Sequence, residues 1–212
     1  MHVAILTFPG FNELDSLIAL GVLNRIRKPD WRVTLCCPEE RVTSMNGVTV
    51  HAQSRLEDAS RADVVLVGSG IRTRDIAADP DILSALKLDP ERQLIGAQCS
   101  GTLLLAKLGL LSGVPACTDL TTKPWVQEAG VEVLNQPFYA AGNVATAGGC
   151  FASQYLAAWA IARTEGIDAA RSALHYVAPV GEKEEYVARA MRNIAPYLEA
   201  MADASAPLRG AA

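Results

Sequence analysis

Short runs of apolar and β-branched residues alternate along this chain with segments of helical length and amphipathic pattern. Strand-like runs occur at residues 3–8, 32–37, 63–67 and 93–98, and three of these four lead directly into a helix-length segment. Strands that are separated by helices pair in parallel, because the chain must cross over before it returns to the sheet. The sequence therefore predicts an α/β fold with a doubly wound, mostly parallel central sheet.

The length and composition fit one domain rather than two. The chain has 212 residues, of which 50% are hydrophobic and 20% are charged, and a chain of this size buries a full core as a single unit. We expect a single-domain flavodoxin-like sandwich over residues 1–200. Residues 201–212 are mostly small, and we expect them to form a disordered C-terminal tail.

Periodicity and turn signals place the remaining elements. Asn46-Gly47 lies between two strand-like triplets and predicts a hairpin in which both central turn residues have positive φ. Further strands are expected at 114–117, 131–134 and 144–147. Helices are expected at 12–25, 75–88, 100–111, 150–163, 168–175 and 182–198. In the first of these helices, Leu14, Leu17, Ile18 and residues 20–23 are expected on the buried side.

Charge and hydropathy exclude two classes of partner. The net charge is −4 and no run of Lys or Arg occurs, so nothing predicts a nucleic-acid partner. No stretch reaches the roughly 18 uninterrupted apolar residues of a membrane span, so we expect no membrane partner. The N-terminal residues lack the basic region of a secretory signal, so we expect the chain to begin here and to be cytoplasmic.

The cysteines predict neither disulfides nor zinc. There are five of them, an odd number, and none forms a C-x-x-C pair. We expect no metal and no organic cofactor. Four are expected to be small buried hydrophobic residues, namely Cys36, Cys37, Cys117 and Cys150.

Cys99 is the exception, because it lies between a buried strand and an apolar helix in L-I-G-A-Q-C-S-G-T-L-L-L. Ala97 and Gly101 flank it two residues away on each side, and small residues there let the strand and helix approach closely and push the central side chain outward. The helix N-terminus is expected to lower the pKa of the thiol. The pattern predicts a nucleophile elbow, and a core cysteine at a strand end is the alternative.

Four motifs in sequence order resemble the DJ/PfpI superfamily of class I glutamine-amidotransferase-like proteins. They are L-T-F-P-G-F-N-E-L-D at 6–15, L-V-G-S-G at 66–70, A-Q-C-S-G-T-L-L-L-A at 97–106 and G-N-V-A-T-A-G-G at 142–149. The resemblance implies a homodimer that acts on a small-molecule substrate through the elbow cysteine. Gly148 and Gly149 match the late glycine turn near the site of that family, and structural packing is the alternative.

The resemblance also implies the partners of Cys99. Asp15 stands where the family has an acidic residue that hydrogen-bonds the cysteine, with Glu13 as a nearby competitor and a plain helix-end role as the alternative. A carboxylate beside a thiolate is a repulsive pair, so one of the two is expected to hold a proton, with Asp15 as the donor. The backbone N–H groups of Gly70 and Ser100 are expected to form an oxyanion-type pocket, and a plain glycine turn at Gly68-Ser69-Gly70 is the alternative.

The chain departs from the family where a histidine is expected. Ser100 follows the cysteine where peptidase-like members have His, and Asp119 stands where other members have a His after the elbow helix. The three histidines of the chain, His2, His51 and His175, are expected to be structural or exposed. We expect Asp119, together with the late glycine turn, to support the site from behind the reacting residues.

A cysteine with an acid and no histidine is most similar to the isonitrile hydratase-like branch. There the cysteine attacks the terminal carbon of an isonitrile, and a thioimidate is hydrolysed to an N-substituted formamide, with Asp15 as acid and base. That branch has Thr where this chain has Ser100. Two alternatives stay open. One is a redox-sensing or ligand-binding regulator that uses oxidation of Cys99, and the other is a glyoxalase or deglycase, against which the missing histidine counts.

Overall fold

The computed structural model describes residues 1–198 and contains a seven-stranded sheet in the order β5-β2-β1-β6-β7-β9-β8. Neighbouring strands are parallel except for the antiparallel pair β8 and β9. The strands are β1 (His2–Leu6), β2 (Arg32–Cys37), β5 (Ser54–Arg55), β6 (Val64–Val67), β7 (Leu94–Gln98), β8 (Phe138–Ala141) and β9 (Val144–Ala147). The predicted α/β class and mostly parallel sheet are confirmed, and the tail expected at 201–212 lies outside the described residues.

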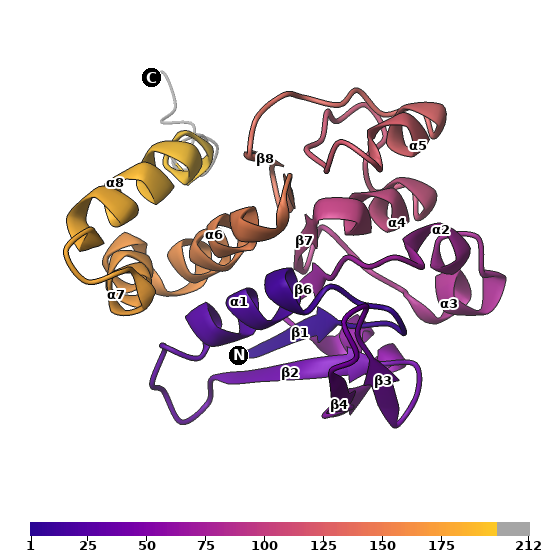
Figure 1. Ribbon diagram of the computed structural model, residues 1–212, viewed down its shortest axis with the longest axis horizontal. Helices are drawn as coiled ribbons and strands as arrows, with labels where there is room; N and C mark the ends of the chain where they lie inside the picture. Colours follow the sequence, from indigo (N-terminus) through magenta and orange to yellow (C-terminus); the bar gives the residue numbers. More distant parts are fainter. Residues whose placement is uncertain (199–212) are drawn as a thin grey trace, which may run out of the picture.

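Helices cover both faces of the sheet (Figure 1). One face carries α1 (Glu13–Leu23), α6 (Ser153–Glu165), α7 (Ile167–Val177) and α8 (Lys183–Ile194). The other carries η1 (Leu56–Arg61), α2 (Thr73–Ile76), α3 (Pro80–Ala85), α4 (Thr102–Lys107) and α5 (Lys123–Glu128). Alternate residues of β1 supply both cores, because successive side chains of a strand point to opposite faces. Val3 and Ile5 pack on the α1 side, and Ala4 and Leu6 pack on the α4 side.

The strand order places a crevice at the carboxyl ends of β1 and β6. From β1 the chain continues to β2 on one side, whereas β6 and β7 extend the sheet on the other side. In doubly wound sheets, ligands bind where the strand order reverses in this way. Two short 3-10 helices, η2 (Cys99–Gly101) and η3 (Cys150–Ala152), begin just beyond the ends of β7 and β9 at the same edge. Within residues 1–198, no helix is long and apolar enough to cross a membrane.

Several predicted elements are wrong in detail. The helix expected at 75–88 is divided into α2 and α3, because the Asp79 side chain accepts hydrogen bonds from the N–H groups of Asp81 and Ile82 and Pro80 starts a new first turn. The strands expected at 114–117 and 131–134 meet only at an isolated bridge between Ala116 and Val133. The edge strand β8 was not predicted.

The hairpin is confirmed, but its turn differs from the expected type. It joins β3 (Arg41–Thr43) to β4 (Thr49–His51). Gly47 has a φ of +90°, whereas Asn46 is not among the residues with positive φ. The Ser44 hydroxyl oxygen accepts hydrogen bonds from the N–H groups of Asn46 and Val48, which closes a longer loop than a two-residue turn.

The apolar side predicted for the first helix is confirmed at Val22 and Leu23, which are buried, but not in the first two turns of the helix. Leu14 and Leu17 are 47% and 36% exposed, whereas Asp15 and Ala19 are fully buried. Asn12 caps this helix by accepting a hydrogen bond from the N–H of Leu14. The rotation that exposes the two leucines is the one that directs Asp15 to the carboxyl edge of the sheet.

Candidate active site

Cys99 has the strained backbone of a nucleophile elbow. Its φ is +51°, and it is the one non-glycine residue with positive φ in the described part of the chain. Side chains rarely adopt this conformation, so it persists only where the surrounding structure enforces it. A Cβ atom on Gly101 would lie 2.7 Å from the carbonyl oxygens of Val67 and Gly68. The small residue two positions after the cysteine is therefore required by the close approach of β6.

Two contacts fix the elbow against the loop that follows α4. The Thr118 hydroxyl donates a 2.8 Å hydrogen bond to the carbonyl oxygen of Cys99. On the other side of this loop, a Cβ on Gly148 would lie 2.6 Å from the carbonyl oxygen of Thr118. The predicted late glycine turn thus permits close packing, and this packing brings Asp119 beside the elbow.

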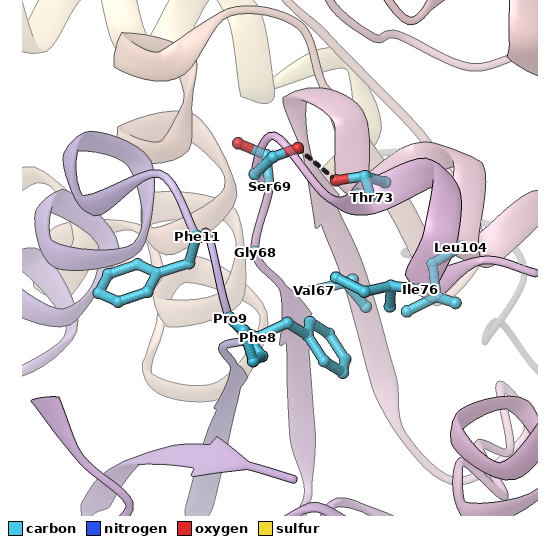
Figure 2. Close-up of a pocket in the computed structure, with 11 residues that line it drawn as sticks. Phe8, Pro9, Phe11, Val67, Gly68, Ser69, Thr73, Ile76 and Leu104 are labelled. Carbon is cyan, nitrogen blue, oxygen red and sulfur yellow. Dashed lines mark hydrogen bonds between the residues drawn. The ribbon is translucent and has the colours of Figure 1, made fainter. Parts of the chain in front are cut away.

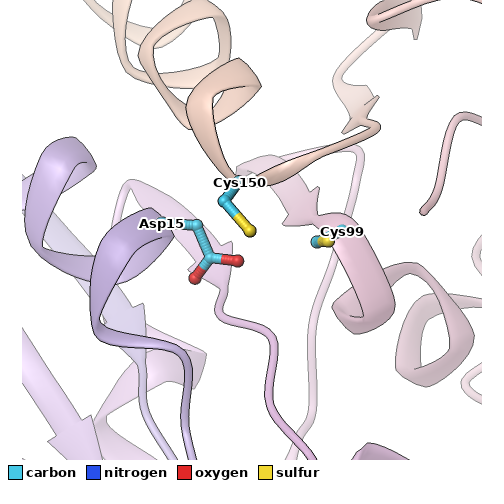
Figure 3. A group of neighbouring side chains, drawn as sticks. All are labelled: Asp15, Cys99 and Cys150. Atoms are coloured by element: carbon cyan, nitrogen blue, oxygen red, sulfur yellow. The ribbon is translucent and has the colours of Figure 1, made fainter. Parts of the chain in front are cut away.

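Three chemically active side chains meet at the carboxyl edge of the sheet. The Sγ atoms of Cys99 and Cys150 and a carboxylate oxygen of Asp15 all lie within 4.8 Å of one another (Figure 3). Asp15 comes from the first turn of α1, Cys99 from η2 and Cys150 from η3. Glu13, the competing acid, has a pKa lowered by its own backbone N–H and by the side chains of Asn46 and Ser44, so it interacts with the hairpin loop.

Asp15 is a buried carboxylate held by two serines. The Ser69 hydroxyl donates to Oδ2, and the Ser16 hydroxyl lies 3.4 Å from Oδ1 as a second donor. Burial raises the pKa of Asp15 to about 6, and the hydrogen bonds from Ser69 and Ser16 limit that rise because they favour the charged form. At neutral pH the carboxyl group is therefore mostly ionised.

The pKa of Cys99 is raised, so the expectation of a lowered pKa is wrong. Burial is the largest cause, followed by the negative charges of Asp119 and Asp15, while the backbone N–H of Gly149 opposes them. The helix dipole does not compensate, because the chain after Cys99 forms three residues of 3-10 helix and then the six residues of α4. Burial and the neighbouring carboxylates therefore favour the protonated thiol, the reverse of the predicted arrangement.

Gly70 and Ser100, the predicted oxyanion pair, are bonded to each other. The Gly70 N–H donates to Ser100 Oγ at 3.1 Å, and the Thr73 hydroxyl lies 2.8 Å from the same oxygen. Gly70 is also a position where only glycine fits, since a Cβ would lie 2.4 Å from the carbonyl oxygen of Gly10. A role of these N–H groups toward a substrate stays a prediction.

Asp119 turns one carboxylate oxygen into its own loop and leaves the other without a partner. Its Oδ1 accepts hydrogen bonds from the N–H groups of Thr121 and Thr122 at 2.9 and 3.0 Å. Its Oδ2 is buried and has no hydrogen-bond partner among the described residues. A buried polar atom in this state is costly unless water or a ligand satisfies it.

An open pocket of about 410 Å³ leads to the two thiols. Among the described residues that line it, none is Lys, Arg or His, so no positive side chain balances Asp119 there. The lining is formed by Asn12, Met45, Ser69, Gly70, Ile71, Cys99, Ser100, Asp119, Thr121, Thr122, Trp125 and Cys150. A second cavity lies beneath Gly68 to Gly70, among Phe8, Phe11, Val67 and Leu104 (Figure 2), but its volume of about 10 Å³ holds no more than a water molecule.

The histidines lie away from this pocket. His2 pairs with the Thr34 hydroxyl at 2.8 Å, and burial lowers its pKa. His51 is exposed on β4, and His175 lies 3.3 Å from Glu184 near the surface. Neither Cys99 nor Asp15 therefore has a histidine partner in the described structure.

Sequence reasoning missed three residues of the site, namely Cys150, its hydrogen-bond donor Asn12, and Ser69. Cys150 was expected in the core, but it is only partly buried, and Asn12 Nδ2 donates to its Sγ at 3.0 Å. Ser69, the donor to Asp15, was noted only as part of a glycine turn. Cys150 had a usable signal, because it follows the strand that pairs with β7 in parallel, and residues beyond neighbouring parallel strands meet at one edge.

The three clustered ligand atoms are also spaced as metal ligands are, although Asp15 already accepts bonds from two hydroxyls.

The fold and the site together define a class of proteins, namely doubly wound α/β proteins with a cysteine elbow and a carboxylate partner. The DJ-1/PfpI family model matches residues 1–163, and the chain belongs to this family. A sequence search of curated proteins finds no significant match.

Several solved structures share the fold of this chain at low sequence identity. A THiJ/PfpI family protein from Pseudomonas syringae superposes with a TM-score of 0.75 at 20% identity, covering 95% of this chain and 84% of that one. DJ-1 from Schizosaccharomyces pombe gives a TM-score of 0.72 at 15% identity, covering 84% of this chain and 100% of its own. An AraC family transcriptional regulator from Pseudomonas putida gives 0.71 at 16% identity, covering 84% and 99%. These likenesses establish the fold and leave the reaction open.

Proposed function

We propose that this protein is a cysteine-dependent enzyme that hydrates a small isonitrile to an N-substituted formamide. The observation that carries the proposal is the strained Cys99 thiol within 4.8 Å of the buried Asp15 carboxylate, with no histidine among the described neighbours. Such a pair can move one proton between sulfur, oxygen and the substrate carbon. The first step of isonitrile hydration requires no more than this.

The reaction begins with a protonated Cys99 and an ionised Asp15, the state that their shifted pKa values favour near neutral pH. Asp15 takes the thiol proton as sulfur bonds to the terminal carbon of the isonitrile, and it then gives that proton to the same carbon. The product of this addition is a thioimidate, and no group leaves.

Hydrolysis of the thioimidate returns the free enzyme. Water adds to the carbon, and one of its two protons passes to the nitrogen. The carbon–sulfur bond then breaks, and the sulfur takes the other proton as the formamide forms. We assign Asp15 as the base for this water and the unpartnered Oδ2 of Asp119 as the group that orients it. The N–H groups of Gly70 and Ser100 can bind the developing negative oxygen once the Ser100 hydroxyl rotates away from Gly70.

The pocket favours an uncharged substrate with an apolar substituent. Its described lining offers the carboxylate of Asp119 and no cationic side chain, so an anionic substrate would be repelled. The side chains of Met45, Ile71 and Trp125 give the rim an apolar surface. An isonitrile is neutral, and its terminal carbon is narrow enough to reach a thiol that is 7% exposed.

We also propose that the protein acts as a homodimer, as its resemblance to the family implied. Leu14, Leu17 and the 68% exposed Phe151 supply apolar surface on α1 and η3, two elements that contact each other. A second copy of the chain can cover this surface. Sedimentation at micromolar concentration should give the mass of two chains, and the mass of one chain would contradict the proposal. The cytoplasmic location stays a prediction.

A turnover screen tests the proposed reaction. Purified protein is incubated with aliphatic and aromatic isonitriles and, separately, with methylglyoxal, and the products are identified by mass spectrometry. We expect the wild type and Cys36→Ala to form the formamide at equal rates and Cys99→Ala to fall to the uncatalysed background. Folded wild-type protein that consumes none of the isonitriles would refute the hydratase, and consumption of methylglyoxal alone would favour the glyoxalase alternative.

A further inference from the structure

Cys150 is the one member of the three-residue cluster that the proposed reaction leaves without a role. Its Sγ lies within 4.8 Å of the Sγ of Cys99 (Figure 3). The two cysteines follow neighbouring parallel strands, with Gln98 of β7 in register with Ala147 of β9. The sheet therefore brings the two segments together, and Gly148 and Gly149 connect the end of β9 to Cys150.

The two thiols differ in their access to solvent and in their hydrogen-bond donors. Cys150 is partly exposed at the pocket wall, whereas the other four cysteines are buried. Asn12 Nδ2 donates to Cys150 Sγ at 3.0 Å, so this sulfur has a hydrogen-bond donor at the pocket wall. Cys99 lies deeper, 7% exposed, with Asp15 and Asp119 as negative neighbours. An oxidant that enters the pocket therefore meets Cys150 first.

We propose that Cys150 and Cys99 form a reversible disulfide, in which a hydroperoxide oxidises Cys150 and Cys99 then attacks the oxidised sulfur. In the first step the Cys150 sulfur attacks the peroxide and becomes a sulfenic acid, and its proton passes to the departing alkoxide or hydroxide, which leaves as an alcohol or water. In the second step the Cys99 sulfur bonds to it, Asp15 takes the Cys99 proton, and hydroxide leaves to form water with that proton. The two thiols are oxidised and one peroxide is reduced to an alcohol or water.

The disulfide would give the site a defined resting state under oxidation. The bond occupies the Cys99 sulfur, so a nucleophile at this position is switched off, and a dithiol reductant restores it. The bond also prevents further oxidation of Cys99 to the irreversible sulfinic acid. Loss of turnover in the oxidised state rests on the proposed function, whereas formation of the bond does not.

The test follows the thiols by mass and not by turnover, so its failure is distinguishable from a failure of the isonitrile proposal. Protein is treated with low concentrations of hydrogen peroxide and then analysed by intact mass and by non-reduced peptide mapping. We expect wild type and the control Cys117→Ser to lose two hydrogens, with the peptides of Cys99 and Cys150 crosslinked until dithiothreitol is added. In Cys99→Ala, dimedone should trap a sulfenic acid on Cys150.

The order of attack is tested with Cys150→Ser. Oxidation at Cys99 should be slowed by about tenfold or more in this variant, because the accessible thiol is gone, and it should proceed to two added oxygens. A wild-type protein that gains oxygen on Cys99 while Cys150 stays a free thiol would overturn the proposal. A wild-type rate of oxidation in Cys150→Ser would overturn the assignment of Cys150 as the first thiol to react.

Discussion

Cys99 and the two cysteines of β2 differ in chemistry, although burial raises the pKa of all three thiols. Cys36 and Cys37 lie within β2, and burial raises the pKa of Cys36 and raises that of Cys37 to about 12. Burial is also the largest cause of the raised pKa of Cys99. Cys99 alone adds a strained backbone, a carboxylate that can take its proton, and an open pocket. A reactive thiol is therefore defined here by its partners and its access, and not by a low resting pKa.

Removing the carboxylate partner that distinguishes Cys99 from the β2 cysteines should have its largest effect on turnover. Asp15→Asn keeps the shape of the side chain but removes its ability to take the thiol proton. Cys99 would then lack a proton acceptor, as the two cysteines of β2 do. Turnover of the isonitrile found by the screen should fall by about 10²-fold, the usual scale for loss of a general base. In the wild type, turnover should rise with pH through about 6, where Asp15 ionises. An unchanged rate and an unchanged pH profile in the variant would remove Asp15 from the mechanism.

The same substitution should change the pH dependence of stability. The pKa of Asp15 is 3.8 ordinarily and about 6 in the folded protein, so between these values the folded state binds more protons than the unfolded state. Asp15 therefore contributes to the free energy of unfolding of the wild type below pH 3.8, and this contribution is lost as the pH rises through about 6. The free energy of unfolding of Asp15→Asn relative to wild type should therefore increase by up to about 3 kcal/mol across that window.

Urea unfolding at a series of pH values measures this difference. Asp168→Asn, at an exposed position on α7, serves as the matched control and should show no comparable trend. A difference between Asp15→Asn and wild type that stays constant from pH 3 to pH 7 would contradict the raised pKa.

Alkylation rates sharpen the comparison among the thiols themselves. With limiting iodoacetamide near neutral pH, Cys150 should react at least about tenfold faster than Cys36, Cys37 and Cys117, because it is accessible and hydrogen-bonded by Asn12. Peptide mapping of the early time points gives the order. Labelling of Cys99 before Cys150 would indicate the lowered pKa that the sequence suggested and the structure contradicts.

The smallest effect concerns the backbone of the elbow. Gly101→Ala places a Cβ 2.7 Å from two carbonyl oxygens of β6 and the residue after it, so it should destabilise the protein by about 1–3 kcal/mol. Gly21 in α1 has open space within 4 Å of the point where a Cβ would lie, so Gly21→Ala should stabilise the protein by about 0.5–1 kcal/mol. Equal effects of the two substitutions in denaturant unfolding would show that the elbow is not closely packed.

Much of the framework could be predicted because it depends on local patterns. Strand runs at 3–8 and 93–98 correspond to β1 and β7, and the small residues around Cys99 predicted its conformation, since the steric cause lies within a few residues. The edge strand β8 gave no such signal, because its place depends on antiparallel pairing with β9. Asp79 and Pro80 did carry a local helix-start signal, which the apolar periodicity of 75–88 masked.

The composition of the site was harder to predict than its location. Asp15 was placed correctly, but its charge state was not, because the pKa values of Asp15 and Cys99 depend on burial and on Asp119, which is distant in sequence. Cys150 was assigned to the core because its own segment is apolar. Its contact with Cys99 arises from the pairing of β7 with β9, a tertiary feature that a single sequence indicates only through strand order.

Trapping the covalent intermediate tests the central claim most directly. Wild-type protein is mixed with the isonitrile that it turns over, quenched in acid within milliseconds to seconds, and analysed by peptide mapping. We expect the Cys99 peptide to gain the full mass of the isonitrile, in agreement with a thioimidate, and the gain to be absent from Cys99→Ala. Formamide production without any adduct on Cys99, or with an adduct on Cys150 alone, would contradict the account.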